Sequence, residues 1–197
     1  MATPLAFFDV DTQIDFMDPA GSLHVKGAEE IKPRLQRLMA YAREHRIPIL
    51  SSADAHPPDD PSFARWPPHC VVGSAGQERI PETRLPNPCV VPNLAGAFEA
   101  PREWPAQVII EKQAYDASSN ANFDAILQSL GRRRYVVFGV ATDYCVRETA
   151  LSLLQKGYAV QLVTDAIQAI DEAAGQKAIA EMSAAGAKRV KTAEVCV

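Results

Sequence analysis

Short apolar runs and longer helical patterns alternate along most of the chain, and this alternation limits the folds open to it. The runs are rich in the β-branched and aromatic residues of buried strands, at 5–10, 47–52, 108–111, 135–139, 159–164 and 189–191. Amphipathic helices are predicted between them, at about 28–45, 119–130, 143–156 and 172–185. Such alternation favours parallel pairing of the strands. The sequence therefore predicts an α/β fold, an open and mostly parallel sheet with helices on both faces, whose strand order stays open.

The prolines mark a loop-rich middle. Eleven of the fifteen prolines lie between Pro57 and Pro105, and none follows Pro105. Because proline interrupts helices and central strands, we predict a long loop excursion over about 57–105. Trp66 and other large apolar side chains within it indicate that it packs against the remaining chain. A chain of 197 residues can bury one sizeable core, so we predict a single domain over 1–197.

Composition argues against nucleic-acid and membrane partners. The formal net charge is -4, whereas nucleic-acid affinity depends on clustered Lys and Arg. The basic run at 132–134 is predicted to be a solvated turn. No apolar stretch is long enough to span a bilayer, and the N-terminus lacks the pattern of a cleaved signal. We therefore expect a cytoplasmic protein that binds neither nucleic acid nor membrane.

Reactive side chains follow four of the predicted strands. Asp11 follows the first, Asp54 and His56 the second, Lys112 the third and Cys145 the fourth. In open α/β sheets, ligands bind outside the carboxyl ends of the strands. Taken singly, each residue has an ordinary alternative interpretation as a cap, a surface lysine or a buried thiol. Their coincidence at one edge predicts a catalytic site.

Cys145 is the candidate nucleophile. It lies in the first turn of the helix after 135–139, where Thr142 or Asp143 could cap the N-terminus. The helix dipole and a nearby Lys112 would stabilise a thiolate, and the free amides could hold an oxyanion. The remaining cysteines form no CxxC pair and are expected to be structural thiols: Cys70, Cys89 and Cys196.

Asp11 is the candidate general acid and base. Proton transfer from an ordinary thiol to an ordinary aspartate costs about 6 kcal/mol. We therefore expect burial beside Phe7 and Phe8 to raise the pKa of Asp11, and the dipole and Lys112 to lower the pKa of Cys145. Asp11 would then take the thiol proton and deliver it to a leaving amine.

A metal-ligand pattern forms a second candidate site. In the extended run Asp54-Ala55-His56, both functional side chains point to the same side, and His69 can return from the loop as a third ligand. Two imidazoles and a carboxylate suit zinc or iron better than calcium, with manganese a further option. The alternative is that His56 and His69 only bond backbone carbonyls. His24 and His45 have no comparable partners in the sequence and are expected at the surface or in a local hydrogen bond.

Five motifs in order resemble the isochorismatase-like cysteine hydrolases, and among them nicotinamidases most. They are Asp11–Phe16, Asp54–His56, Trp66–Gly73, Lys112 and Gly139–Val146. The resemblance spans nearly the whole chain and implies a six-stranded parallel sheet flanked by helices. It also implies a cis Val140–Ala141 peptide bond. The site residues that it implies are a triad of Asp11, Lys112 and Cys145, an oxyanion hole of the Ala141 and Cys145 amides, and a metal on Asp54, His56 and His69.

The resemblance also implies a substrate. Isochorismatases proper lack the metal motif, whereas nicotinamidases carry it and use the metal to hold the pyridine nitrogen. Phe16 and Trp66 match aromatic positions that enclose the nicotinamide ring, although both could serve ordinary packing instead. The implied reaction converts nicotinamide and water to nicotinic acid and ammonia through a thioester. The resemblance to this family further implies that the chain forms a homo-oligomer.

Two departures leave the substrate open. The segment 113–123 resembles other branches of the family, and the stretch 76–108 is longer and richer in proline than a compact nicotinamidase needs. Ser62 stands where the family often adds a histidine ligand, which would leave the metal more open to water. One alternative is a related cysteine hydrolase of another small amide or carbamoyl compound. Another is a non-catalytic thiol or metal sensor on the same scaffold.

Overall fold

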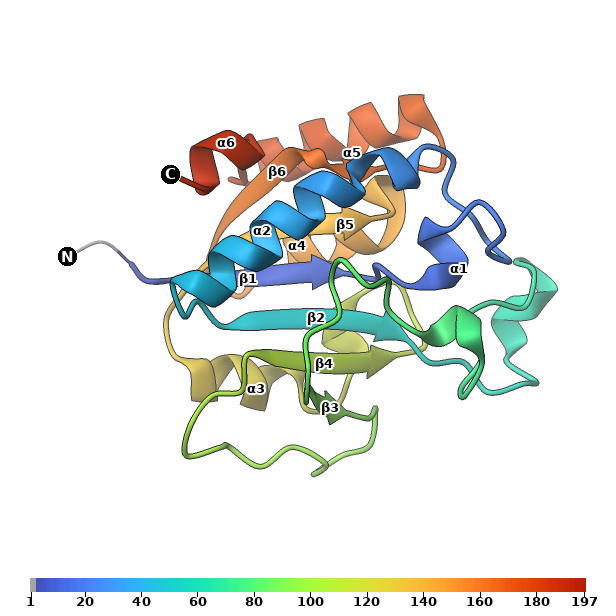
Figure 1. Ribbon diagram of the computed structural model, residues 1–197, viewed down its shortest axis with the longest axis horizontal. Helices are drawn as coiled ribbons and strands as arrows, with labels where there is room; N and C mark the ends of the chain where they lie inside the picture. Colours follow the sequence, from blue (N-terminus) through green and yellow to red (C-terminus); the bar gives the residue numbers. More distant parts are fainter. Residues whose placement is uncertain (1–2) are drawn as a thin grey trace.

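A seven-stranded sheet forms the centre of the computed structural model, which describes residues 3–197 (Figure 1). The strand order is β3-β4-β2-β1-β5-β6-β7, and all neighbouring strands pair in parallel. The strands are β1 (Leu5–Val10), β2 (Ile49–Asp54), β3 (Cys89–Val91), β4 (Gln107–Lys112), β5 (Arg134–Val140), β6 (Ala159–Gln168) and β7 (Lys188–Val190). The expected α/β class is confirmed, but the expectation of six strands was wrong. The additional strand, β3, is a three-residue edge strand inside the proline-rich excursion, too short to produce a periodic pattern.

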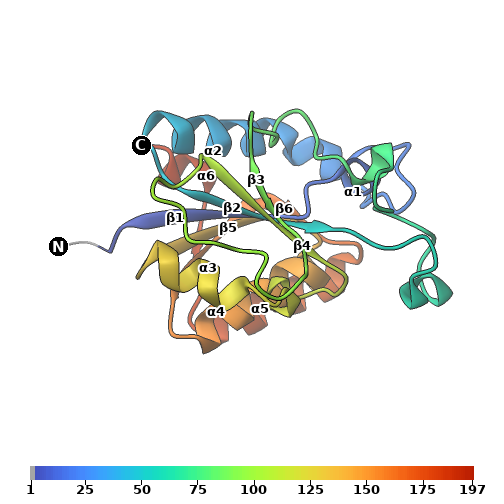
Figure 2. The same cartoon turned by 90° about the horizontal axis from the view of Figure 1, so that it is seen from below.

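Helices cover both faces of the sheet and complete three layers (Figure 2). The first face carries α2 (Lys32–Glu44) and α6 (Thr192–Val195), and the second carries α3 (Phe123–Leu130), α4 (Arg147–Gln155) and α5 (Glu172–Ala184). A short helix, α1 (Ile14–Met17), follows β1. Helix α2 begins later than predicted because 28–31 forms a 3₁₀ turn and Pro33 stands in the first turn of the α-helix. Within the described range, none of the helices combines the length and apolarity needed to cross a membrane.

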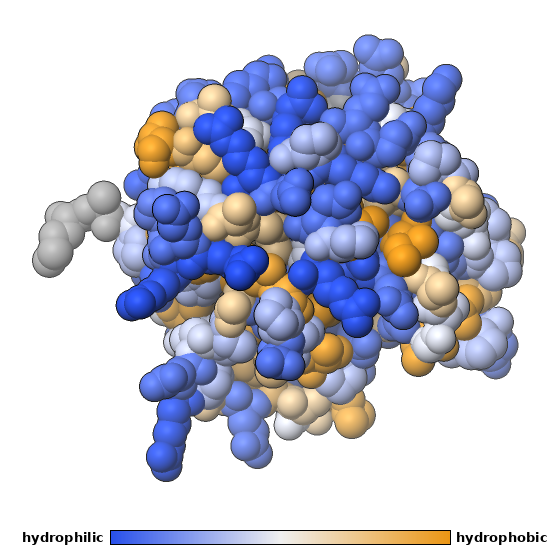
Figure 3. Space-filling model, in the orientation of Figure 1, coloured by the Kyte–Doolittle hydropathy of each residue, from blue (hydrophilic) through white to orange (hydrophobic). Residues whose placement is uncertain are grey.

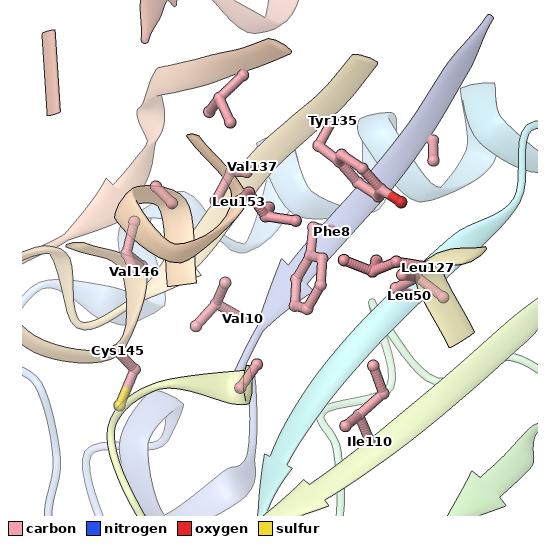
Figure 4. Packing of buried hydrophobic residues seen from close by; sticks show 14 of the residues in the cluster. Phe8, Val10, Leu50, Ile110, Leu127, Tyr135, Val137, Cys145, Val146 and Leu153 are labelled. Carbon is pink, nitrogen blue, oxygen red and sulfur yellow. The ribbon is translucent and has the colours of Figure 1, made fainter. Parts of the chain in front are cut away.

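Each face of the sheet has its own hydrophobic cluster. Because side chains alternate along a strand, Phe7 joins the cluster under α2, whereas Phe8 joins the one under α3, α4 and α5. In the second cluster, Phe8 packs with Leu50 and Tyr135 (Figure 4). Burial of each such side chain contributes roughly 1.5–3 kcal/mol. The face seen in Figure 3 is mainly hydrophilic, with hydrophobic residues in small separate groups.

The topology places a ligand site beside the central strand. From β1 the chain builds β2, β3 and β4 on one side, then crosses to β5, β6 and β7 on the other. The carboxyl ends of β1 and β5 therefore lie at a topological switch point, where open α/β sheets bind their ligands. Asp11 immediately follows β1, and Cys145 lies five residues after Val140, the last residue of β5.

The excursion reaches this edge of the sheet through two isolated bridges. Gln13 pairs with Arg79 in the antiparallel sense, and His56 pairs with Val71 in the parallel sense. The second bridge returns the chain beside the end of β2. In Figure 1 the excursion passes the tips of the strand arrows together with α1. It can therefore contribute side chains to a site built by the sheet.

Candidate active site

Lys112 lies at the centre of a buried group of reactive side chains. Its Nζ is 2.8 Å from Asp11 Oδ2 and 3.6 Å from Cys145 Sγ, and it also bonds Asp54 Oδ1. Asp11 Oδ1 accepts a hydrogen bond of 2.6 Å from the Ser52 hydroxyl. Lys112 is fully buried, so its charge depends on these carboxylates. The structure thus brings the three residues of the predicted triad into contact around one ammonium group.

Burial changes the proton affinity of both predicted proton-transfer partners. It raises the pKa of Asp11 even though Lys112 opposes the shift, as expected. It also raises the pKa of Cys145 well above the usual range, and the negative charges of Asp11 and Asp54 add to the effect. The expectation that the pKa of the Cys145 thiol is lowered was therefore wrong. Burial of the sulfur outweighs the helix end and Lys112, and the two carboxylates that share this cation with the sulfur add to the effect.

Cys145 is held in a π-helical turn, Thr142–Val146, between β5 and α4. Tyr144 and Val146 both donate backbone hydrogen bonds of 3.1 Å to the carbonyl of Ala141, the residue before the turn. Figure 4 shows the Cys145 side chain at the margin of the hydrophobic cluster, with its sulfur directed away from Val146. Such single π turns are frequent at functional sites.

The predicted side-chain cap of this turn was wrong. No side chain caps it, because the Asp143 carboxylate accepts hydrogen bonds of 3.0 Å from the amides of Ile170 and Asp171 instead. Asp143 thereby ties the turn to the loop after β6. The peptide bond between Val140 and Ala141 is cis, as the resemblance implied.

Asp54, His56 and His69 converge as a possible metal site. Their ligand atoms lie within 4.8 Å of one another, with Asp54 Oδ2 at 3.5 Å from His56 Nε2 and 3.8 Å from His69 Nε2. Each Nδ1 has another partner, Asp60 Oδ2 at 2.9 Å for His56 and the Pro67 carbonyl at 2.8 Å for His69. The two Nε2 atoms are therefore presented to a common point, as in metal sites whose outer partners orient the imidazoles.

The chemistry of this donor set suits a divalent metal. Burial works against ionisation of Asp54, but Lys112 and the two imidazoles hold its pKa well below the usual range, so it stays a carboxylate. Two imidazole nitrogens and one carboxylate oxygen match three-ligand zinc sites that keep a position open. Ser62 Oγ, six residues after His56, is buried without a hydrogen-bond partner among residues 3–197, so it is a polar atom that a bound water could satisfy. The residues present fit zinc or iron.

A small cavity adjoins both groups of residues. Its volume is about 40 Å³, and its lining includes Asp11, Asp54, His69, Ala141 and Cys145. The predicted ring-binding residues Phe16 and Trp66 also line it. The other lining side chains are Leu23, Val25, Tyr115, Val140, Tyr144 and Ile170. An engineered apolar cavity that binds benzene measures about 150 Å³, so an amide with a ring needs the wall of this smaller cavity to move.

Several residues at the site were not predicted from the sequence. Tyr115 and Tyr144 extend the aromatic wall, with ring centroids 5.2 Å apart. Tyr144 adjoins Cys145 in the sequence, and this proximity was the available signal. Gln13 clamps the end of β2 by donating to the Asp54 carbonyl at 2.8 Å and accepting from its amide at 2.7 Å. No periodic pattern signals such a long-range clamp.

Known proteins resemble the chain over nearly its whole length. A model of the Isochorismatase domain matches residues 6–194. The curated nicotinamidase of Escherichia coli (strain K12) is 29% identical over 205 residues, which cover 93% of each protein. The solved pyrazinamidase of Pyrococcus horikoshii in complex with zinc is 32% identical with a TM-score of 0.80, covering 94% of this chain and 98% of that one.

A solved structure named for a different activity has the same fold. The N-carbamoylsarcosine amidase of Thermoplasma acidophilum is 26% identical with a TM-score of 0.75, covering 96% of each chain. Fold likeness alone therefore leaves the substrate open. Because the family model matches almost the entire chain, the chain belongs to the isochorismatase family.

Proposed function

We propose that this chain is a metal-assisted cysteine amidohydrolase that converts nicotinamide and water to nicotinic acid and ammonia. One observation carries the proposal: Lys112 joins Asp11, Cys145 and Asp54, and Asp54 belongs in turn to the possible metal site. The nucleophile, the acid-base group and two of the three metal ligands, Asp54 and His69, thus face one cavity. This combination suits hydrolysis of an amide attached to a ring with a basic nitrogen.

The first half of the reaction forms a thioester. Asp11 takes the proton of the Cys145 thiol as the sulfur attacks the amide carbonyl carbon, and the amides of Ala141 and Cys145 hold the oxyanion. Asp11 then returns the proton to the leaving nitrogen, and ammonia departs as the carbon–nitrogen bond breaks. The raised pKa of Asp11 reduces the cost of the first transfer, and the raised pKa of Cys145 keeps the resting thiol protonated.

The second half hydrolyses the thioester. Asp11 removes a proton from water as the water oxygen attacks the thioester carbon, and the breaking carbon–sulfur bond releases nicotinic acid. The proton then restores the thiol. Lys112 keeps the local charge balanced because its ammonium contacts both Asp11 and Cys145. When bound on Asp54, His56 and His69, a zinc or iron ion would supply a Lewis acid for the ring nitrogen, with manganese a further option.

The apolar wall of the cavity supports a neutral, flat substrate. Phe16 and Trp66 are proposed to enclose the ring, since aromatic faces stack on aromatic amides. Tyr115 and Tyr144 extend that wall. Among the cavity's described lining residues there is no arginine or lysine that could bind an anionic group of a substrate.

Ammonia release from a panel of small amides tests the substrate. We expect the highest kcat/KM with nicotinamide, then pyrazinamide, and about 10²-fold less with aliphatic amides, because a site shaped for a ring loses binding energy without one. Highest activity with N-carbamoyl compounds would instead support the related-hydrolase alternative. The divergent segment 113–123, which places Tyr115 on the cavity wall, is the observation that favours this alternative. Release of no ammonia from any of these compounds would favour the alternative that the chain is a non-catalytic thiol or metal sensor.

Elemental analysis tests the metal. We expect about one zinc or iron ion per purified chain, and a loss of most of it in His69→Ala, because two remaining ligands bind a divalent ion poorly. The matched control is His24→Ala, since His24 pairs with Glu29 at 2.9 Å outside the cluster. Equal metal content in the two variants would contradict the proposed ligand set.

A further inference from the structure

Asp60 connects the possible metal site to a separate local structure. Its Oδ2 is 2.9 Å from His56 Nδ1, and its Oδ1 accepts a 2.8 Å hydrogen bond from the amide of Ser62. Asp60 is thereby the N-cap of the 3₁₀ turn Pro61–Ala64. The residue and its bond to His56 are buried, whereas its bond to the Ser62 amide is half-buried. One carboxylate therefore holds a candidate metal ligand and the start of a turn.

The 3₁₀ turn packs on the candidate metal ligands and leads directly to Trp66. The ring centroid of Phe63 lies 5.6 Å from that of His56 and 5.7 Å from that of His69. The backbone amide of Trp66 donates to the Ser62 carbonyl at 3.1 Å. A displacement of the turn would consequently be passed to Trp66.

Trp66 forms a wall of the cavity that must open for a substrate to enter. Its indole Nε1 donates a 3.0 Å hydrogen bond to the Tyr115 hydroxyl, and its ring contacts Tyr144 edge-on with centroids 5.5 Å apart. Tyr115 is 38% exposed, so this contact lies at the surface, where it can break and re-form. At about 40 Å³, the cavity is too small for a ring unless its wall moves.

We propose that Asp60 is a positioning residue that couples metal binding at His56 to closure of Trp66 over the cavity. A metal on His56 Nε2 fixes the imidazole with Nδ1–H directed at Asp60, because outer partners and metal together determine the ring orientation. The carboxylate held in this way then fixes Ser62 and the turn that carries Trp66. Without metal, the imidazole ring is freer to move, and the turn is held less firmly. This inference rests on the metal site of the proposed function.

Trp66 itself reports the coupling. The chain has two tryptophans, and Trp104 packs on Phe98 with centroids 6.2 Å apart in a different part of the excursion. In a Trp104→Phe background, metal-free protein is titrated with zinc alone while acrylamide quenching of Trp66 is measured. We expect saturating zinc to lower the quenching constant by about twofold or more, because binding orders the wall.

Asp60→Asn separates capping from coupling. Asparagine remains a good N-cap, so the turn should form, but it loses the carboxylate that orients His56. In a competition with a coloured chelator, we expect zinc affinity to fall about 10–100-fold. At saturating zinc, Trp66 should remain as accessible to acrylamide as in the metal-free protein. The matched control is Asp59→Asn, an exposed neighbour, which should behave like the parent.

The outcomes distinguish the coupling from the proposed function. Equal zinc protection of Trp66 in Asp60→Asn and in the parent would overturn the coupling. Zinc binding by the parent without protection of Trp66 would overturn it as well, while the metal site would stand. A parent that binds no zinc would overturn both. Far-UV circular dichroism of each variant checks that it is folded.

Discussion

Cys145→Ala is expected to lower kcat/KM for amide hydrolysis by about 10⁴-fold or more, because it removes the atom that would form the thioester. The proposed oxyanion hole, acid-base group and metal site cannot replace a nucleophile. The measurement is ammonia release under single-turnover and steady-state conditions with nicotinamide. Activity close to that of the parent would show that the attacking atom lies elsewhere.

Cys70→Ala is the matched control for this variant. Cys70 is also a buried thiol, and its Sγ lies 3.9 Å from the Gly76 carbonyl instead of beside Lys112. Its removal leaves a small cavity, which should cost about 1 kcal/mol of stability and leave kcat within about twofold. The difference between the two alanine variants therefore reports the environment of the thiol. Simple loss of a buried sulfur would affect both.

The predicted site depended on strand ends, and this part of the prediction succeeded for a physical reason. Parallel strands end at one edge, so Asp11, Asp54 and Lys112 had to lie near one another once their strands were neighbours. The order β4-β2-β1-β5 places these strands side by side, with β5 leading to Cys145. The sequence pattern identified the strands without their order, so the distances between side chains became known only from the structure.

The errors arose where distant parts of the chain meet. The pKa of Cys145 was predicted from its own helix end and Lys112, whereas burial of the thiol raises it and the charges of Asp11 and Asp54, from two other strand ends, add to the effect. Strand β3 depends on pairing with β4 inside an irregular segment. Tyr115 acts through a single long-range contact with Trp66, and Asp60 through local contacts in an irregular loop; neither leaves a periodic trace.

A buried ion pair below Asp11 also had no signal in the sequence. Asp9 lies within β1, fully buried, and bonds the guanidinium of Arg79 from the excursion. Thr12 donates to Asp9 at 3.0 Å, and Arg79 donates to the Ser52 carbonyl at 2.9 Å. At this place the excursion, instead of a helix, covers the face of the sheet, and it does so with polar groups. Gln107 contributes similarly, donating to the Thr83 carbonyl at 2.9 Å.

Arg79→Met is expected to lower the free energy of unfolding by about 3–5 kcal/mol, because it leaves the Asp9 carboxylate buried without its cation. The double variant Asp9→Leu/Arg79→Met should recover most of this loss, since no uncompensated charge remains. Urea unfolding measures both. The control is Arg84→Met, an exposed partner of Glu78, with an expected change within about 0.5 kcal/mol.

The pH dependence of the loss separates an orphaned charge from poor packing. Burial raises the pKa of Asp9 even with Arg79 present, and removal of Arg79 should raise it further. A carboxyl whose pKa is higher in the folded state is most stabilising while protonated, and this stability is lost as the pH rises through the folded pKa. The deficit of Arg79→Met should therefore grow over the interval from about pH 3.9, the ordinary aspartate pKa, to neutral pH. A deficit that stays constant over this interval would assign the loss to packing of the arginine stem. The ion pair between Asp9 and Arg79 would then contribute little to stability.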